Sequence, residues 1–250
     1  MTLAAPTPLQ LLHEDDGLRL QYLPGSTASL VVAFSGIGHG FGGMQTQEFT
    51  GTASDQGRNH VLFVADRRRS WYTTPGLIDT LVAIVAQTAA RIGVPDVKTI
   101  GNSMGGYGAV RFSREFPVSA VASFSPQFSM ARSVVREDRW DQFQAAIDFE
   151  AHLPLSDCLM AGTLYYLIFG GLGTTELKHR NLFPARPGLH LITLPGAGHN
   201  VVQKIKDYGL LEPCVQAIFA GDQARMIRLQ ADYVAAFTAA AAAAAVAPPA

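Results

Sequence analysis

The sequence predicts an α/β protein with a mostly parallel central sheet and helices on both of its faces. Short β-branched and aromatic runs recur along the chain and alternate with segments whose apolar residues have helical spacing. Several of these runs are apolar on both faces, which is typical of strands buried in a parallel sheet. Turns that contain glycine connect the runs to the segments that follow. We therefore expect alternating strands and helices around one sheet.

Length and composition favour a globular, enzyme-like body. The chain has 250 residues, of which 48% are hydrophobic and 16% are charged, so it can bury a sizeable core. The formal net charge is −1. We therefore expect no strongly basic surface that would attract a nucleic acid or an anionic membrane. The first residues lack the basic start and apolar core of a secretory signal, so we expect a cytoplasmic protein with no membrane partner.

The expected strands are Leu18–Leu23, Ser29–Phe34, Asn59–Ala65, Val97–Gly101, Val118–Phe124, Leu164–Phe169 and Leu189–Leu194. The expected helices are Leu77–Ile92, a run that follows Gly105 and stops before Pro117, a helix from Val201, and Leu210–Ala220. We expect one domain over residues 1–234 and an alanine-rich tail over 235–250, as a frayed helix or a poorly ordered extension. Residues 130–161 are more charged and are broken by Pro154, which suggests either a small helical cap or an ordinary connecting helix pair.

The segment Lys98 to Tyr107, KTIGNSMGGY, contains the pattern G-x-S-x-G directly after an expected strand. This pattern is typical of a sharp strand-to-helix turn, in which the glycines leave room for a serine in a strained conformation. Ser103 would then be exposed above the sheet, with the backbone N–H of Met104 and the start of a helix beside it. The alternative is a glycine-rich turn in which the serine has no chemical role.

Two motifs resemble those of a known superfamily. GNSMGG resembles the nucleophile elbow of the α/β-hydrolase superfamily, and PGAGHN at Pro195 to Asn200 resembles its late catalytic-histidine loop. The order of the elements agrees from about Leu18 to about Ala220. The resemblance implies an α/β-hydrolase fold and a serine hydrolase of esterase or acyl-hydrolase type that requires no metal and no organic cofactor.

The resemblance also implies a catalytic triad in the chain order nucleophile, acid, base. Ser103 is the expected nucleophile, and His199 is the expected base because it alone follows a late strand through a loop of small residues. The superfamily often has an aspartate at the position of Gly173, which this chain lacks. Glu176 is the nearest carboxylate in the same loop and is the expected acid; without it, the protein would use a Ser/His dyad.

The loop SGIGHGFGG, residues 35–43, contains five glycines after an expected strand. In α/β-hydrolases this loop contributes a backbone N–H to the oxyanion hole, so Gly36 and Ile37 are candidates beside Met104. His39 is a candidate substrate-binding residue in the same loop. The glycines also match G-x-G-x-x-G, which leaves a dinucleotide loop as the weaker alternative.

The strand Asn59–Ala65 is followed by arginines and aromatic residues. Ligands collect at the carboxyl ends of strands in open α/β sheets, so Arg67, Trp71 and Tyr72 could bind an anionic or sugar-like substrate. A solvated basic turn beside a packed tryptophan is the alternative.

These expectations lead to a functional hypothesis: a serine hydrolase that cleaves a carboxylic ester or thioester of a small or carbohydrate-like molecule through an acyl-enzyme on Ser103. An acyltransferase with the same triad and a catalytically silent binding scaffold are the alternatives. The expected partner is a small ester or acyl substrate.

Overall fold

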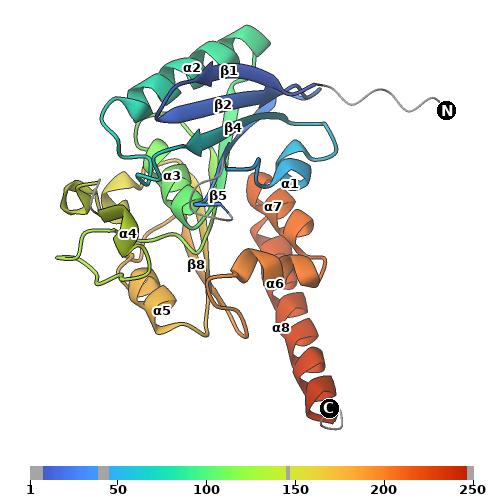
Figure 1. Cartoon of the computed structure of the whole chain (residues 1–250). Coiled ribbons are helices and arrows are strands. Elements are labelled where there is room, and N and C mark those ends of the chain that lie inside the picture. Colours follow the sequence, from blue (N-terminus) through green and yellow to red (C-terminus); the bar gives the residue numbers. More distant parts are fainter. Residues whose placement is uncertain (1–7, 39–44, 145–146, 247–250) are drawn as a thin grey trace.

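The computed structural model describes residues 8–38, 45–144 and 147–246. Its strands are β1 (Gln10–Glu14), β2 (Leu18–Leu23), β3 (Ser29–Phe34), β4 (His60–Asp66), β5 (Asp96–Asn102), β6 (Ala120–Phe124), β7 (Leu164–Gly170) and β8 (Leu189–Leu194). Within the described residues they form one sheet in the order β1-β2-β4-β3-β5-β6-β7-β8 (Figure 1). β1 pairs antiparallel with β2, and β2 pairs antiparallel with β4. All other pairs are parallel, which confirms the predicted mostly parallel sheet.

The helices of the described residues are α1 (Thr50–Ser54), α2 (Leu77–Ile92), α3 (Met104–Phe112), α4 (Asp141–Gln144), α5 (Thr174–Asn181), α6 (Val201–Asp207), α7 (Leu211–Phe219) and α8 (Gln223–Val246). Two short 3-10 helices, η1 (Phe149–Ala151) and η2 (Leu155–Cys158), lie in the segment predicted as a cap. The described part of this segment contains short helical turns and irregular chain, and it covers part of the core through Phe149 and Leu155.

The hydrophobic core has two layers, one on each face of the sheet. Leu30 and Val32 of β3 belong to the layer that contains α2, α3 and part of the cap segment. Val31 and Ala33 belong to the opposite layer, which contains α7 and α8 together with parts of α1 and α6 (Figure 1). This alternation follows from the period of two along a strand. Helices lie on both faces, as the sequence predicted.

The position of β3 determines where the functional residues meet. β3 lies between β4 and β5, so the chain leaves it on one side and returns on the other. Phe34 of β3 is in register with Gly101 of β5. The loop after β3 and the loop after β5 therefore begin side by side, at the kind of switch point where ligands bind in open α/β sheets.

Several elements differ from the sequence expectation: α1 and α5 lie where no helix was expected. β1 was not expected either; it lies at the edge of the sheet, and none of its side chains is fully buried. α8 continues without interruption from Gln223 to Val246 and extends away from the body (Figure 1). It crosses the proposed boundary between residues 234 and 235, and the division into a domain and a tail stays a prediction.

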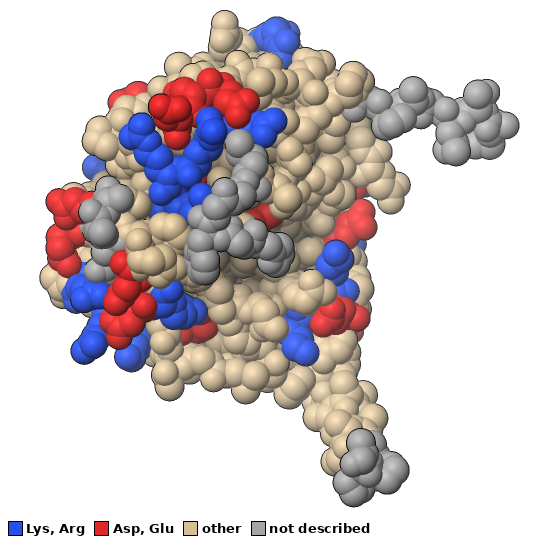
Figure 2. Space-filling model, in the orientation of Figure 1, with Lys and Arg blue, Asp and Glu red and all other residues tan. Residues whose placement is uncertain are grey.

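Opposite charges lie next to one another on the surface. Figure 2 shows acidic and basic side chains interspersed on the viewed face. Pairs of this kind include Arg132 with Asp141 and Arg136 with Asp138. Among the helices of the described residues, none has both the length and the apolar character needed to cross a membrane.

We expect the substitution Gly101→Ala to disrupt the turn after β5. A Cβ atom at Gly101 would lie 2.1 Å from the backbone oxygen of Gly105, and neither backbone can move without separating β5 from α3. The free energy of unfolding should fall by about 3 kcal/mol or more. Urea unfolding followed by circular dichroism measures this change.

Gly51→Ala is the matched control, because Gly51 lies in α1 and a Cβ atom there would meet nothing within 4 Å. Alanine is the better helix former, so this variant should be unchanged or more stable by up to about 1 kcal/mol. Equal effects of the two substitutions would contradict the proposed packing of the turn.

Candidate active site

Ser103 occupies the turn between β5 and α3. Its backbone angles are φ 56° and ψ −121°, a conformation that costs a residue with a side chain about 1–3 kcal/mol. The Ser103 N–H donates a 2.8 Å hydrogen bond to the carbonyl of Phe124, at the end of β6. Gly105 brings the first turn of α3 against the end of β3, where a Cβ atom would lie 2.2 Å from the Phe34 oxygen. These contacts fix the serine above the sheet, as G-x-S-x-G indicated.

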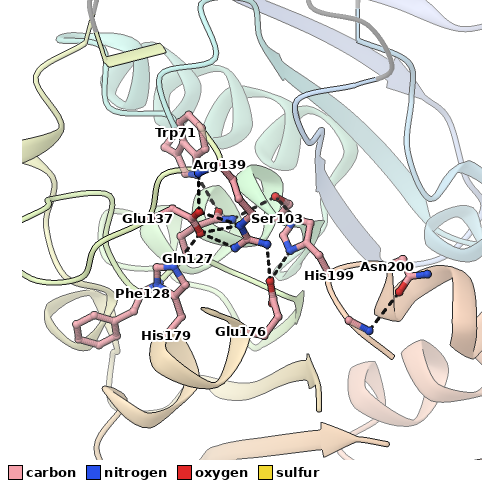
Figure 3. A network of polar contacts seen from close by, with 11 residues as sticks. Trp71, Ser103, Gln127, Phe128, Glu137, Arg139, Glu176, His179, His199 and Asn200 are labelled. Atoms are coloured by element: carbon pink, nitrogen blue, oxygen red, sulfur yellow. Dashed lines mark hydrogen bonds and ion pairs between the residues drawn. The ribbon is translucent and has the colours of Figure 1, made fainter. Parts of the chain in front are cut away.

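A chain of hydrogen bonds connects Ser103, His199 and Glu176 (Figure 3). Nε2 of His199 lies 2.8 Å from Oγ of Ser103, and Nδ1 lies 2.8 Å from Oε1 of Glu176. His199 follows β8, and Glu176 lies in the first turn of α5. The structure thus brings together the three residues that the sequence singled out for the triad, although they come from three separate parts of the chain.

The positions of the protons in this series of hydrogen bonds follow from the ionisation of Glu176. Burial raises the pKa of Glu176, but the hydrogen bonds from His199 and Arg139 and their charges lower it more, so the net pKa lies below its ordinary value. An ionised carboxylate only accepts hydrogen bonds, so Nδ1 of His199 must be the donor. When the ring is neutral, its Nε2 is then the acceptor for the Ser103 hydroxyl. This is the tautomer that a general base requires.

Arg139, from the cap segment, links the acid to a second buried group. Its Nη1 donates to Oε1 of Glu176 at 2.8 Å, and its guanidinium also binds both carboxylate oxygens of Glu137. His179, one turn after Glu176 in α5, lies 3.3 Å from Glu137 and accepts the backbone N–H of Phe128 at 3.0 Å. The cap, α5 and the loop after β6 are therefore joined by one polar network (Figure 3).

The charges within this network compensate one another. Burial raises the pKa of Glu137, but the hydrogen bonds from Arg139 and His179 and the Arg139 charge lower it to about 2. For Arg139, burial lowers the pKa, but the hydrogen bonds and charges of Glu137 and Glu176 raise it more, so the net pKa lies above its ordinary value.

Among the described residues, no group of histidine, cysteine or acidic side chains is arranged to hold a metal ion.

Gln127 is a site residue that the sequence interpretation missed. It follows β6, and its Nε2 donates to Oγ of Ser103 at 3.3 Å. Its Oε1 accepts the indole N–H of Trp71 at 2.9 Å. The sequence feature that could have indicated Gln127 is the position of the segment SPQFSM, residues 125–130. It follows β6, the strand that pairs with β5 before the elbow. No motif distinguishes this glutamine from other polar residues in such loops.

The candidate oxyanion-hole donors differ in their surroundings. Among the described residues, the N–H groups of Met104 and Ile37 have no hydrogen-bond acceptor in the protein. The Gly36 N–H already donates to Oε1 of Glu48 at 3.0 Å, and burial raises the pKa of that carboxyl to about 7 despite this bond. Between these two candidates, Ile37 rather than Gly36 therefore has the N–H that is available as a donor among the described residues. His39 lies outside the described residues.

The loop after β4 is an unusual turn built around Asp66. Arg69, Trp71 and Tyr72 all have positive φ values of 54° to 58°, which is uncommon for residues with large side chains. The buried Asp66 carboxylate offsets this strain by accepting the backbone N–H groups of Ser70 and Tyr72 at 2.6 and 2.9 Å. The turn therefore has one imposed conformation that directs Trp71 towards the site.

Residues of this loop form hydrogen bonds to other parts of the same chain. Trp71 and Tyr72 are fully buried, and the Tyr72 hydroxyl donates to the Ser35 carbonyl at 2.7 Å. Arg67 donates to the Asp15 carbonyl in the turn before β2. A side chain without exposed surface cannot bind a substrate in this conformation. The interpretation of Trp71 and Tyr72 as substrate-binding residues is therefore revised to a supporting role.

No protein-family model matches the sequence, and no curated protein matches it. Solved structures do resemble the chain. Capsule O-acetyltransferase of Neisseria meningitidis serogroup A has a TM-score of 0.62 and 16% identity, over 86% of this chain and 97% of the transferase. An alpha-beta serine hydrolase homologue from Coxiella burnetii has a TM-score of 0.51 and 14% identity, over 88% and 100%. The esterase Pf2001 of Pyrococcus furiosus has a TM-score of 0.51 and 14% identity, over 81% and 88%.

These similarities agree with the mostly parallel sheet and the helices described above. The chain has the α/β-hydrolase fold, which it shares with serine esterases and with an O-acetyltransferase. At such low identity the similarities concern the fold and not the reaction.

The polar network predicts a specific dependence of stability on pH. The pKa of Glu137 is about 2 in the folded protein and 4.5 ordinarily, so its stabilisation is complete above pH 4.5 and is lost as the pH falls towards 2. The difference of about 2.5 between these values corresponds to about 3 kcal/mol. Glu137→Gln should therefore lower the free energy of unfolding by about this amount at pH 7, and its deficit relative to the wild type should shrink below pH 4.5.

Urea unfolding at pH 7, 5, 4 and 3 tests this prediction. Glu115→Gln is the control, since Glu115 forms an exposed pair with Arg111 and should change stability by less than about 1 kcal/mol. A deficit of Glu137→Gln that stays constant across this pH range would show that the carboxylate is not ionised in the network.

Proposed function

We propose that the chain is a serine hydrolase that cleaves a carboxylic ester or thioester of a small or carbohydrate-like molecule. The observation that carries this proposal is the continuous chain of 2.8 Å contacts from Oγ of Ser103 through His199 to Glu176. A serine hydroxyl is a weak nucleophile unless a base takes its proton and a third group orients that base. Glu176 supplies this third group, which accounts for the missing aspartate at the position of Gly173.

In the proposed reaction, Nε2 of His199 removes the Ser103 proton while Oγ attacks the acyl carbon. Negative charge moves to the carbonyl oxygen, where the N–H groups of Met104 and Ile37 are the proposed donors. His199 then protonates the leaving group, and an acyl-enzyme remains on Ser103. Water, activated by the same histidine, attacks the acyl carbon, the bond to Oγ breaks, and the proton returns to the serine.

Acyl transfer to an alcohol is the second candidate function. The similarity to a capsule O-acetyltransferase favours it, and so does the cap segment, because the Trp140 ring lies 6.0 Å from the His199 ring. An aromatic ring beside the base would hinder water and could support a sugar or another alcohol. In this case a hydroxyl group would replace water in the second step, and the triad would be unchanged.

Labelling by a fluorophosphonate probe tests whether Ser103 is activated. The wild type should be labelled, Ser103→Ala should not be, and His199→Ala should be labelled at least about a thousandfold more slowly because the base is lost. Glu176→Ala should slow labelling by about a hundredfold or more. A folded wild type that resists labelling would contradict both acyl-transfer functions and would favour a binding scaffold.

The products distinguish hydrolysis from transfer. With p-nitrophenyl acetate as donor and methyl glucoside as a trial acceptor, the proposed hydrolase should release p-nitrophenol and acetate in equal amounts. Acetylated methyl glucoside detected by mass spectrometry, with a corresponding deficit of acetate, would instead favour the transferase. Ser103→Ala provides the background rate for both products.

A further inference from the structure

Gln127 lies between the nucleophile and a buried indole. Its Nε2 is 3.3 Å from Oγ of Ser103, and its Oε1 is 2.9 Å from Nε1 of Trp71. Gln127 is 1% exposed and Trp71 is 0% exposed. Neither residue belongs to the hydrogen-bond chain from Ser103 to Glu176, so the contact of Gln127 with Oγ of Ser103 needs its own explanation.

The orientation of the amide is imposed by Trp71. An indole N–H can only donate, so the amide must present its oxygen to Trp71 and its NH₂ group to Ser103. Trp71 itself is fixed by the turn around Asp66 and by edge-to-face packing on Phe149, with ring centroids 5.2 Å apart. The backbone next to Gln127 is also fixed, because the Phe128 N–H is bonded to His179.

We propose that Gln127 is a further catalytic residue, whose amide N–H stabilises the negative charge that develops on Oγ of Ser103. This inference rests on the proposed function. In the first step the O–H bond of Ser103 breaks towards His199 as the bond from Oγ to the acyl carbon forms. In the second step that bond breaks and His199 returns a proton to Oγ. The serine oxygen carries partial negative charge in both transition states, and the amide donor faces it in both.

The role differs from that of an oxyanion hole. Met104 and Ile37 are the proposed donors to the carbonyl oxygen of the substrate, whereas Gln127 contacts the oxygen of the enzyme itself. A donor at this position also orients the Ser103 hydroxyl. Because Gln127 donates to Oγ, the hydroxyl proton points to His199. A purely structural glutamine would require the bond to Trp71 but not a donor towards Ser103.

Three variants test the donor. Gln127→Glu keeps the shape and the acceptor for Trp71, removes the N–H towards Ser103 and, when ionised, adds a negative charge beside Oγ. Gln127→Met removes both polar ends without adding a charge, so it tests the loss of the donor by itself. Trp71→Phe keeps a buried ring but releases the amide, which can then rotate. The readout is the second-order rate constant of labelling by the fluorophosphonate probe, in which Oγ bonds to phosphorus, fluoride leaves and His199 takes the proton.

We expect labelling to slow by about 10- to 100-fold in Gln127→Glu and Gln127→Met, as for loss of a hydrogen bond to a charged group. Trp71→Phe should slow it by about 3- to 10-fold, because part of the population keeps the productive orientation. Tyr107→Phe is the matched control: it removes the part-buried 2.8 Å hydrogen bond from the Tyr107 hydroxyl to the Leu153 carbonyl and keeps the backbone N–H bond to the Ser103 carbonyl, so its labelling rate should equal that of the wild type. Melting temperatures are measured for all four variants.

The outcomes separate this inference from the proposed function. An unlabelled wild type overturns both. A labelled wild type together with Gln127→Glu or Gln127→Met at the wild-type rate overturns the role of Gln127 alone. Slow labelling of Tyr107→Phe to the same extent as the Gln127 variants, with similar melting temperatures, would also overturn it, because general loosening would then explain the effect.

Discussion

The strained backbone at Ser103 is the constraint on which the other features of the site depend. A serine at φ 56° is stable only where the surrounding chain leaves no alternative, and here β5, α3 and the end of β6 hold it on three sides. Gly101 and Gly105 permit this arrangement because their backbones touch other backbones directly. The conformation presents Oγ to His199, which follows β8, and to Gln127, which follows β6. The chemistry therefore depends first on backbone packing and only then on the side chains.

The polar groups around Ser103 form two series of hydrogen bonds that meet at Arg139. One branch runs through His199 and Glu176 to Arg139, and the other runs through Gln127, the neighbouring backbone and His179 to Glu137, which binds the same arginine. Buried ionic groups gain little net stability when all of them are paired, but removing one partner is costly. These hydrogen bonds therefore act mainly to specify one geometry. Because Arg139 belongs to the cap segment, the environment of the proposed acid depends on how that segment is placed.

The sequence predicted those features that depend on local pattern. The parallel strands follow from short apolar runs, the elbow from G-x-S-x-G, and His199 and Glu176 from their places after the last two strands. Gln127 and Arg139 could not be predicted, because their roles arise from contacts across 24 and 37 residues of chain. Trp71 and Tyr72 were assigned to substrate because arginines and aromatics follow β4. Their burial depends on positive φ values that Asp66 imposes, and no local sequence rule indicates that turn.

In the proposed mechanism, hydrolysis and acyl transfer differ in which oxygen attacks the acyl-enzyme. The side chain of Glu176 is 4% exposed, whereas that of His199 is 28% exposed, so the proposed base is more open to an incoming hydroxyl than the proposed acid. The ring of Trp140 lies beside it and is held in the cap next to Arg139, which binds the acid. In the proposed mechanism, the same short segment thus contacts both the base and its orienting carboxylate. A change in this segment could alter the acyl acceptor while the fold and the triad remain the same, which is consistent with one fold serving esterases and an O-acetyltransferase.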